Sequence, residues 1–457
     1  MTGHPLVGHS REVNISFAYD APKPTRLGSA LRTDTDLDVA ENGGTSLNAR
    51  CRGRSRLRAI VIGAGFAGAC AAFLLRERLG ASVTLLERQP HPGGMLRTLY
   101  TDDGLPYEYG PRVLSVFRGT ANALDFLKRF LDLEERDIYQ GTRLRPDYPA
   151  IPFPVDRESL MRLPCGNRIR DELAQLSDTA ADEANLRTYL ETTVGPTLTR
   201  LVFEGFNRKF WGRELDQLPA SWGKLRRLER IAGTGSYRLP SVAPHYYPKG
   251  GFNSLFEELL QGFEVHYGSR ALSVEAVSDG VIVHCEGTSI RAEFVIATGP
   301  IDELFAHAFG PLEWKGYRIV LGVSTQAVNG SAPDGVPFAW LYTPWEETPV
   351  CRRTDFGVIH QGRDRPGAAV VLEEIPDDRV RMYPVWWEEE RFNRYLRATA
   401  EIPGLIPLGR LGLYKYVTTD STYGMVERLV ATLPRYQRAD ANERFEILKQ
   451  VRGDWSN

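Results

Sequence analysis

A glycine-rich turn followed by an acidic residue is the clearest chemical feature of the sequence. Gly63, Gly65 and Gly68 form a GxGxxG motif directly after the apolar, β-branched run 58–63. In a strand–turn–helix unit the first glycine permits the tight turn, the second lets the backbone approach a pyrophosphate, and the third lets helix and strand pack closely. Glu87 ends the next apolar run, where a carboxylate accepts hydrogen bonds from an unphosphorylated adenosine ribose. The pattern predicts a dinucleotide whose phosphates lie at a helix N-terminus.

Two further segments indicate which dinucleotide is bound. The run 92–98 (PGGMLRT) resembles the second glycine pair of FAD-dependent oxidase-like families, in which the backbone approaches the flavin half of the cofactor. The run 294–299 (FVIATG) ends a predicted strand in the small-residue manner of the third FAD segment. Both favour FAD over NAD. They imply cofactor contacts at Gly93, Gly94, Arg97 and Gly299.

The elements around these segments predict an α/β protein. Apolar runs of strand length flank a helical pattern at 66–79, and residues 82–87 form the second strand. The overall expectation is a Rossmann-type FAD-binding domain with a helical insert domain and an antiparallel β-sheet domain. The expected parts are an FAD-binding domain at 58–117, 250–316 and 405–435, a mainly helical substrate or oligomerisation domain at 118–249, part of the antiparallel sheet at 317–404, and a C-terminal segment at 436–457.

Composition limits the other possibilities. The chain has 457 residues and a net charge of about -2, which gives no sign of a nucleic-acid or membrane partner. Five scattered cysteines and eight histidines lack disulfide or metal-ligand spacing, so we expect no metal site and a reducing, cytoplasmic location. Residues 1–57 are predicted to be a poorly ordered extension or an over-long start. The alternative is a tail that folds over the site or onto a partner.

The segments between the FAD motifs resemble one family, the UDP-galactopyranose mutases. They occur in the family's order between about 58 and 430. The segments are YGPRVLS (109–115), FPV (153–155), KFWG with LPAS (209–221), YPKGGF (247–252), TGPID with FGPLEW (298–314) and GRLGLYKY (409–416).

This resemblance implies an activity and its partners. The family interconverts pyranose and furanose forms of a nucleotide-diphosphate sugar, with N5 of reduced FAD as the nucleophile at the anomeric carbon and no net redox change. A nucleotide-diphosphate sugar is therefore the expected substrate. NAD(P)H or another reductant would activate the enzyme, and a homo-oligomer of unspecified size is expected.

The resemblance also assigns roles to individual residues. A fork of guanidinium groups must face the departing diphosphate, and Arg226 and Arg352 occupy the family's positions for it. Arg410 matches the flavin-contacting arginine. The aromatic residues implied at the base, the sugar and the diphosphate are Phe206, Trp211, Tyr237, Tyr383 and Tyr416. The alternative is that the arginines form surface ion pairs and that the aromatic residues pack in the core.

Several positions depart from the family pattern. Arg112 replaces the family's histidine beside the flavin, and Thr418 replaces an aspartate, with Asp420 close by. Phe206 replaces a base-stacking tyrosine, and Asp156 replaces an asparagine of a turn. Because these positions surround the substrate, the sugar or the nucleotide need not be UDP-galactose. Arg112 would either favour the anionic reduced flavin or reach another substituent of the sugar.

Two other function classes stay open at the level of sequence. Amine oxidases and protoporphyrinogen oxidase share the three FAD segments, so an FAD-dependent oxidoreductase is the first alternative. A flavoprotein that has lost activity and serves as a scaffold is the second, consistent with the replacements at Arg112 and Thr418. The TGPID and GRLGLYKY segments weigh against the oxidase.

Overall fold

The structure is a computed structural model that describes most of the chain between residues 57 and 453. The described residues are 11–13, 57–115, 121–136, 138–153, 155, 157–176, 182–225, 229–231, 236–238, 245–333, 335–362 and 367–453. The predicted N-terminal extension, 1–57, therefore lies almost wholly outside the described residues.

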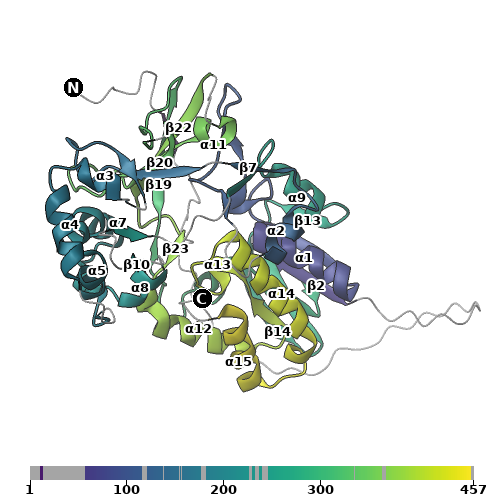
Figure 1. Cartoon of the computed structure of the whole chain (residues 1–457). Coiled ribbons are helices and arrows are strands. Elements are labelled where there is room, and N and C mark those ends of the chain that lie inside the picture. The colour runs from purple at the N-terminus through teal and green to yellow at the C-terminus, as the bar shows by residue number, and fades with distance from the viewer. Residues whose placement is uncertain are drawn as a thin grey trace, which may run out of the picture.

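A parallel sheet carries the glycine-rich turn (Figure 1). Its strand order is β13-β3-β2-β17-β24, and every neighbouring pair is parallel. The crossover helix α1 and the strands β2 and β3 fall where the sequence pattern predicts them, which confirms the Rossmann-type unit. The bounds are β2 Arg58–Ile62, α1 Phe66–Leu79, β3 Ser82–Glu87, β13 Glu264–Tyr267, β17 Phe294–Ala297 and β24 Leu405–Pro407.

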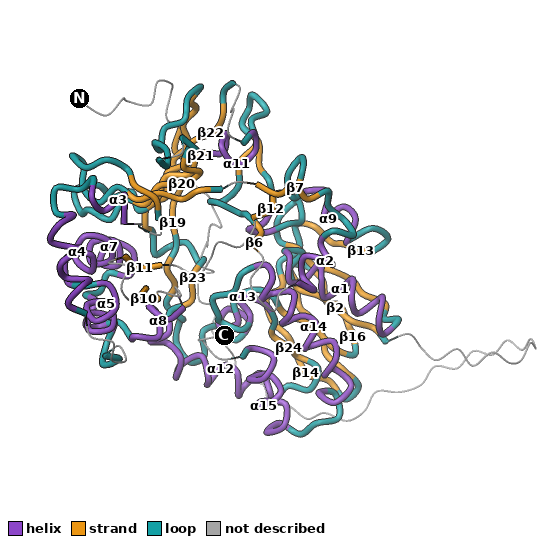
Figure 2. The backbone as a smooth tube through the Cα atoms, in the orientation of Figure 1, coloured by secondary structure: helices purple, strands orange, loops and turns teal. Residues whose placement is uncertain are grey.

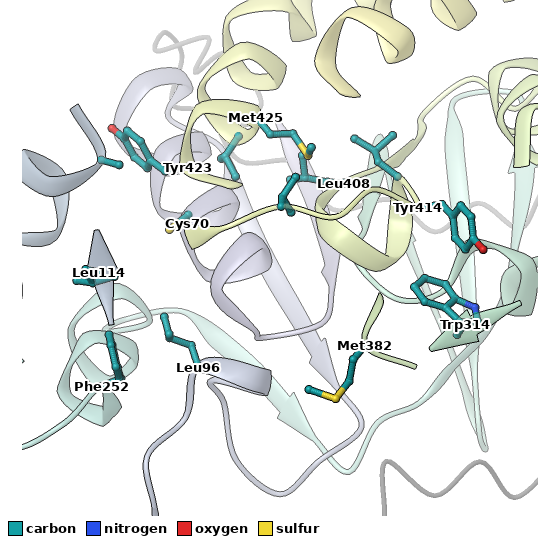
Figure 3. Close-up of a cluster of buried hydrophobic side chains, with 14 of the residues drawn as sticks. Cys70, Leu96, Leu114, Phe252, Trp314, Met382, Leu408, Tyr414, Tyr423 and Met425 are labelled. Carbon is teal, nitrogen blue, oxygen red and sulfur yellow. The ribbon is translucent and has the colours of Figure 1, made fainter. Parts of the chain in front are cut away.

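Both faces of this sheet are covered, as a parallel sheet requires. Val61 and Ile296 face the helical side, where α1 packs against α14 (Thr419–Tyr436). Ile60 and Val295 face a three-stranded antiparallel sheet on the other side. Figure 3 shows the helical side of the core, with Cys70, Leu96, Phe252 and Met425 among its buried side chains. The antiparallel strands are β14 Ala271–Val277, β15 Gly280–Cys285 and β16 Thr288–Ala292.

Gly68 is the glycine that lets α1 approach β2. A Cβ added at this position would lie 1.9 Å from the Gly63 carbonyl oxygen and 3.1 Å from Cγ1 of Val61. We expect Gly68→Ala to destabilise the fold by about 3 kcal/mol, the upper part of the range for overpacking. Thermal unfolding of the flavin-free protein measures this change. Gly424→Ala is the matched control, because Gly424 lies within α14 and an added Cβ would meet only Nη1 of Arg428, at the ordinary contact distance of 3.5 Å. Equal stabilities for both variants would contradict the close approach.

A second, larger sheet stands beside the first. Its seven strands run in the order β1-β19-β22-β21-β20-β8-β9, and all neighbours are antiparallel except β20 and β8. This confirms the antiparallel sheet component. The bounds are β1 Arg11–Val13, β8 Tyr139–Thr142, β9 Ile151–Pro152, β19 Tyr317–Ser324, β20 Phe338–Tyr342, β21 Arg352–Asp355 and β22 Ala369–Pro376.

A group of helices packs beside the seven-stranded sheet. In Figure 2 these helices lie at the left and the parallel sheet lies at the right. It contains α3 Arg157–Met161, α4 Gly166–Gln175, α5 Leu186–Val194, α6 Pro196–Leu198, a π-helix at Thr199–Glu204, α7 Gly205–Trp211 and α8 Ala220–Leu225. The range expected to be mainly helical, 118–249, also contains β8 and β9, which complete the large sheet. The domain boundaries themselves stay a prediction.

Short elements connect these layers. The remaining helices are α2 Ala121–Leu127, α9 Asn253–Leu259, α10 Ile301–Leu304, α11 Phe356–Gln361, α12 Glu389–Glu401, α13 Gly409–Gly412 and α15 Ala441–Arg452, with 3-10 turns at η1 Gly94–Leu96, η3 Leu215–Gln217 and η4 Trp386–Glu388. The small strands are β4 Leu99–Tyr100, β5 Pro106–Tyr107, β6 Leu114–Ser115, β7 Leu133–Arg136, β10 Glu229–Ile231, β11 Ser236–Arg238, β12 His245–Pro248, β18 Trp314–Lys315 and β23 Tyr383–Pro384. Among the described residues, no helix has the length and apolar composition needed to cross a membrane.

Candidate cofactor and substrate site

One cavity of about 410 Å³ lies at the carboxyl ends of the parallel strands. This is where open α/β sheets bind ligands. It brings together segments that are far apart in the sequence. Its lining includes the predicted residues Gly63, Gly65, Glu87, Gly93, Gly94, Arg112, Gly299, Arg410, Tyr416 and Thr418.

The glycine-rich turn and Glu87 are held together by backbone hydrogen bonds. The Gly63 N–H donates to the Leu86 carbonyl at 2.7 Å, and Gly63 has a φ of +97°, which favours glycine. One Glu87 carboxylate oxygen accepts from the Ala64 N–H at 2.7 Å, and the other accepts from the Gln89 N–H at 2.8 Å. These bonds fix the carboxylate at the edge of the cavity.

The space beside the glycines fits a dinucleotide. A Cβ at Gly65 would meet only the Gly94 Cα, at 3.8 Å, and a Cβ at Gly299 would meet nothing within 4 Å. The protein therefore leaves these backbone surfaces bare toward the cavity. Gly65 is the N-cap of α1 and has no side-chain cap, so the first N–H groups of this helix are available to a phosphate. The Gly93 N–H donates to the Ala64 carbonyl at 2.9 Å and joins the two glycine segments.

Arg112 and Arg410 supply positive charge to the cavity wall. The Arg112 side chain donates to the carbonyls of Met95 at 3.2 Å and Tyr109 at 2.7 Å. The Arg410 side chain donates to the carbonyls of Met382 at 3.2 Å and Val417 at 2.6 Å. Burial lowers the pKa of Arg112, and the charges of Arg410 and Arg352 act in the same direction.

Tyr383 and Tyr416 form a stacked pair under Arg410. Their ring centroids are 5.6 Å apart with an interplanar angle of 17°. The Arg410 guanidinium carbon lies 5.0 Å from the Tyr416 centroid and 5.6 Å from the Tyr383 centroid. Burial raises the pKa of Tyr383, although Arg352 opposes this. The structure thus groups three of the predicted site residues, which come from two parts of the chain.

Arg352 is close to this group but already has a partner. It lies on β21 directly opposite Glu374 of β22, and the two side chains form a bidentate pair with one N–O distance of 2.7 Å. The Arg352 side chain is 15% exposed and that of Glu374 is 1% exposed. Burial acts to lower the pKa of Arg352, but the Glu374 carboxylate raises it above its ordinary value. Glu374 was not predicted from the sequence, which shows the Arg352–Arg353 and Glu373–Glu374 doublets but not the strand register that pairs them.

The aromatic residues of α7 have different surroundings. Phe206 contacts Tyr342 edge to face at 5.8 Å, and the Arg352 guanidinium lies 5.9 Å from the same Tyr342 ring. Phe206 and Arg352 therefore both lie against the Tyr342 ring. Trp211 is 2% exposed and packs against Trp222 and Trp386 at 5.0 Å each. It does not line the cavity, and its surroundings are those of a core residue.

Most of the remaining predicted residues lie outside the cavity or outside the described residues, whereas Thr418 lies in the cavity lining. Arg97 is not in the cavity lining, and Gly68 serves helix packing instead. Thr418 is the N-cap residue of α14 and bonds the side chains of Asp420 and Ser421. Arg226, Asp156 and the side chain of Tyr237 fall outside the described part of the chain.

Two polar arrangements beside the site were not anticipated. The Lys209 ammonium donates to backbone carbonyls of Thr348 at 3.2 Å and Val350 at 2.9 Å, which anchors the hairpin that carries Arg352. The buried Glu108 carboxylate accepts from the Thr98 hydroxyl at 2.9 Å and from the Tyr247 hydroxyl at 2.5 Å. Both depend on contacts between distant segments. Among the described residues there is no His, Cys, Asp and Glu cluster suited to a metal, and Cys70, Cys165, Cys285 and Cys351 are free thiols.

Comparison with known protein sequences shows which proteins this chain is similar to. Residues 61–130 match the family model of an NAD(P)-binding Rossmann-like domain, and residues 201–416 match that of UDP-galactopyranose mutase. A UDP-galactopyranose mutase of Mycoplasma pneumoniae is 23% identical, over 79% of this chain and 92% of the relative. A dTDP-fucopyranose mutase of Escherichia coli is also 23% identical, over 79% of this chain and 94% of the relative.

Solved structures agree on the fold. A reduced UDP-galactopyranose mutase matches with a TM-score of 0.66 at 16% identity, covering 87% of this chain and 99% of that one. A putative protoporphyrinogen oxidase from Exiguobacterium sp. 255-15 matches less well, with a TM-score of 0.57 at 15% identity over 83% of this chain and 100% of that one. The family and the Rossmann-type cavity together imply a flavin cofactor. The family model, the mutase relatives and the structural match confirm the resemblance to the UDP-galactopyranose mutases that the ordered motifs indicated.

Proposed function

We propose that this protein binds FAD and, with the flavin reduced, interconverts the pyranose and furanose forms of a nucleotide-diphosphate sugar. One observation carries the proposal above the others. The dinucleotide turn, Arg112, Arg410 and Tyr416 line a single cavity, and the Tyr383–Tyr416 pair links that cavity to the neighbourhood of Arg352. This arrangement supports a flavin site with guanidinium groups suited to a diphosphate beside it.

Reduced FAD, when bound, would supply the nucleophile for the anomeric carbon, and the reaction would leave no net change in redox state. The chain's own residues bind and orient the reactants. Glu87 would accept hydrogen bonds from the adenosine ribose, and the N-terminus of α1 at Gly65 would hold the pyrophosphate. Arg410, fixed by two backbone carbonyls above the tyrosine pair, would hold the flavin side of the site.

Arg352 would stabilise the nucleoside diphosphate as it leaves the sugar. A leaving diphosphate gains negative charge, and a guanidinium that is already in position stabilises this charge with little reorganisation energy. The bidentate bond to Glu374 fixes the plane of the guanidinium and leaves its remaining N–H groups for a second partner. Tyr383 and Tyr416 would contact the diphosphate or the sugar, and Phe206 would contact the base. Arg226 and Tyr237 are proposed for the same diphosphate.

The nucleotide and the sugar are left as a class. The two curated relatives are named for a UDP-sugar and a dTDP-sugar, so both bases belong in any test. Phe206 keeps an aromatic ring but has no hydroxyl. We further propose that NAD(P)H or another reductant activates the flavin, and that the protein forms a homo-oligomer.

Binding and oxygen measurements separate this function from the oxidase alternative. The mutase should bind UDP or dTDP in calorimetry, with affinity reduced by Arg352→Met, and should consume no oxygen in proportion to product. An FAD-dependent oxidase would consume oxygen with an amine or porphyrinogen substrate and show no affinity for either nucleoside diphosphate. That second pattern would overturn the proposal.

A further inference from the structure

Arg112 is anchored to the segment that faces the flavin in FAD-binding proteins. It lies between β5 and β6, and its Nε–H donates to the Met95 carbonyl of η1 at 3.2 Å. Because η1 begins at Gly94, this bond ties the guanidinium to the second glycine pair. A second bond, to the Tyr109 carbonyl at 2.7 Å, fixes the other side of the group. The position of the guanidinium is therefore set by the cofactor cradle itself.

The cavity wall holds positive charge that carboxylates do not balance. In the described part of the chain, neither Arg112 nor Arg410 has a carboxylate within ion-pair distance, and both donate to backbone carbonyls. The Glu374 carboxylate acts on Arg112 through its charge, but it is already paired with Arg352. The lowered pKa of Arg112 has the same origin, since burial and two like charges disfavour its charged form. An anion in this cavity would relieve that cost.

The pyrophosphate of FAD is an anion in every redox state, but the isoalloxazine ring becomes an anion only when it is reduced. An oxidised flavin ring is neutral, whereas two-electron reduction with uptake of one proton at N5 gives an anion. A second proton at N1 would give the neutral reduced form. A fixed cation beside the ring favours the anion and so favours reduction. Arginine keeps its charge at every physiological pH, whereas a histidine, the residue that the resemblance implies for the family at this position, has an ordinary pKa of about 6.5.

We propose that Arg112 is the electrostatic partner of the reduced flavin and raises the reduction potential of the bound cofactor. The proposal rests on the proposed binding of FAD. Arg112 lines the cavity formed by the FAD segments, while Arg352 lies outside that lining next to Phe206 and Tyr342. The two arginines thus have separate tasks. Arg112 acts on the flavin, and Arg352 acts on the diphosphate.

The test is the reduction potential of the flavin bound to the purified, full-length protein, measured by equilibration with redox dyes. Arg112→Met and Arg112→Gln should each shift the reduction equilibrium toward oxidised flavin by about tenfold, which equals about 30 mV for a two-electron couple. Arg112→Lys, which keeps the charge, should retain most of the wild-type potential. Sulfite, which adds to N5 of the oxidised flavin and leaves a negative charge on the ring, should bind both neutral variants about tenfold more weakly.

Arg379→Met is the matched control. Arg379 also lines the cavity, but it pairs with Asp377 at 2.6 Å and its side chain is 84% exposed. Its substitution should leave potential and sulfite affinity unchanged. Neutral Arg112 variants that bind FAD with wild-type potential would overturn the inference and leave the mutase function standing, even if turnover fell. A wild-type protein without FAD would overturn the proposed function at its first step.

Discussion

Replacing Arg352 with alanine is expected to lower kcat/KM by about 10²- to 10³-fold while FAD stays bound, because a preorganised donor to the departing diphosphate is lost. The steady-state rate with a nucleotide-sugar substrate measures this loss, and the flavin absorbance of the purified variant measures cofactor content. The effect should appear mainly in turnover. A variant with near-normal rates would remove Arg352 from the proposed chemistry.

A second variant is needed to separate loss of turnover from loss of stability, because Arg352 is paired with Glu374. Removing Arg352 alone leaves a carboxylate that is 1% exposed without its cation, which costs about 3–5 kcal/mol of stability. Arg352→Met combined with Glu374→Gln removes both charges and should restore stability without restoring turnover. The adjacent pair offers a matched control, since Arg353 and Glu373 sit one register position away and are more exposed. Arg353→Met should leave turnover near the wild-type value.

Adding one methyl group at Gly65 is expected to expel the cofactor without unfolding the protein. Gly65 has a φ of -73°, which alanine adopts readily, and the added Cβ would meet only the Gly94 Cα at 3.8 Å. The fold should therefore tolerate Gly65→Ala, but the methyl group would occupy the space where the backbone approaches the pyrophosphate. Flavin content after purification should fall at least about tenfold, the effect of a 1.4 kcal/mol loss of affinity.

Thermal unfolding of the flavin-free proteins keeps this prediction distinct from a folding defect. Gly65→Ala and the wild type should unfold at similar temperatures when both lack flavin, whereas Gly68→Ala should unfold well below them. A full complement of flavin in Gly65→Ala would show that the dinucleotide does not lie against this turn.

The local parts of the fold were predictable because the signals are local. The strand, the turn and the helix around Gly63 occupy consecutive residues. Each glycine of the motif stands where a side chain would disturb the turn, the expected approach of the pyrophosphate or the packing of the helix. Glu87 was predictable for the same reason, since it ends the next strand of the same unit. The order of family motifs then predicted the remaining layers. Most of the predicted residues of the FAD segments line one cavity, and Arg112, Arg410 and Tyr416 line the same cavity.

The non-local parts of the site could not be predicted in this way. The bond between Arg352 and Glu374 depends on the register of β21 against β22, and the Glu108 network joins residues more than a hundred positions apart, such as Tyr247. Trp211 shows the converse. Its motif matches the family, but the side chains that surround it, Trp222 and Trp386, place it in the core. Packing between distant segments decided each of these cases.

The most direct measurement is turnover of UDP-, dTDP- and GDP-linked pyranoses by the protein after reduction with dithionite, followed by chromatography and NMR of the sugar. The mutase account predicts that at least one substrate reaches a pyranose–furanose equilibrium, that many turnovers occur for each flavin reduced, and that the oxidised protein is inactive. Reduced, FAD-loaded protein that leaves every member of the panel unchanged would contradict the account. Product formed in strict proportion to the reductant consumed would contradict it as well.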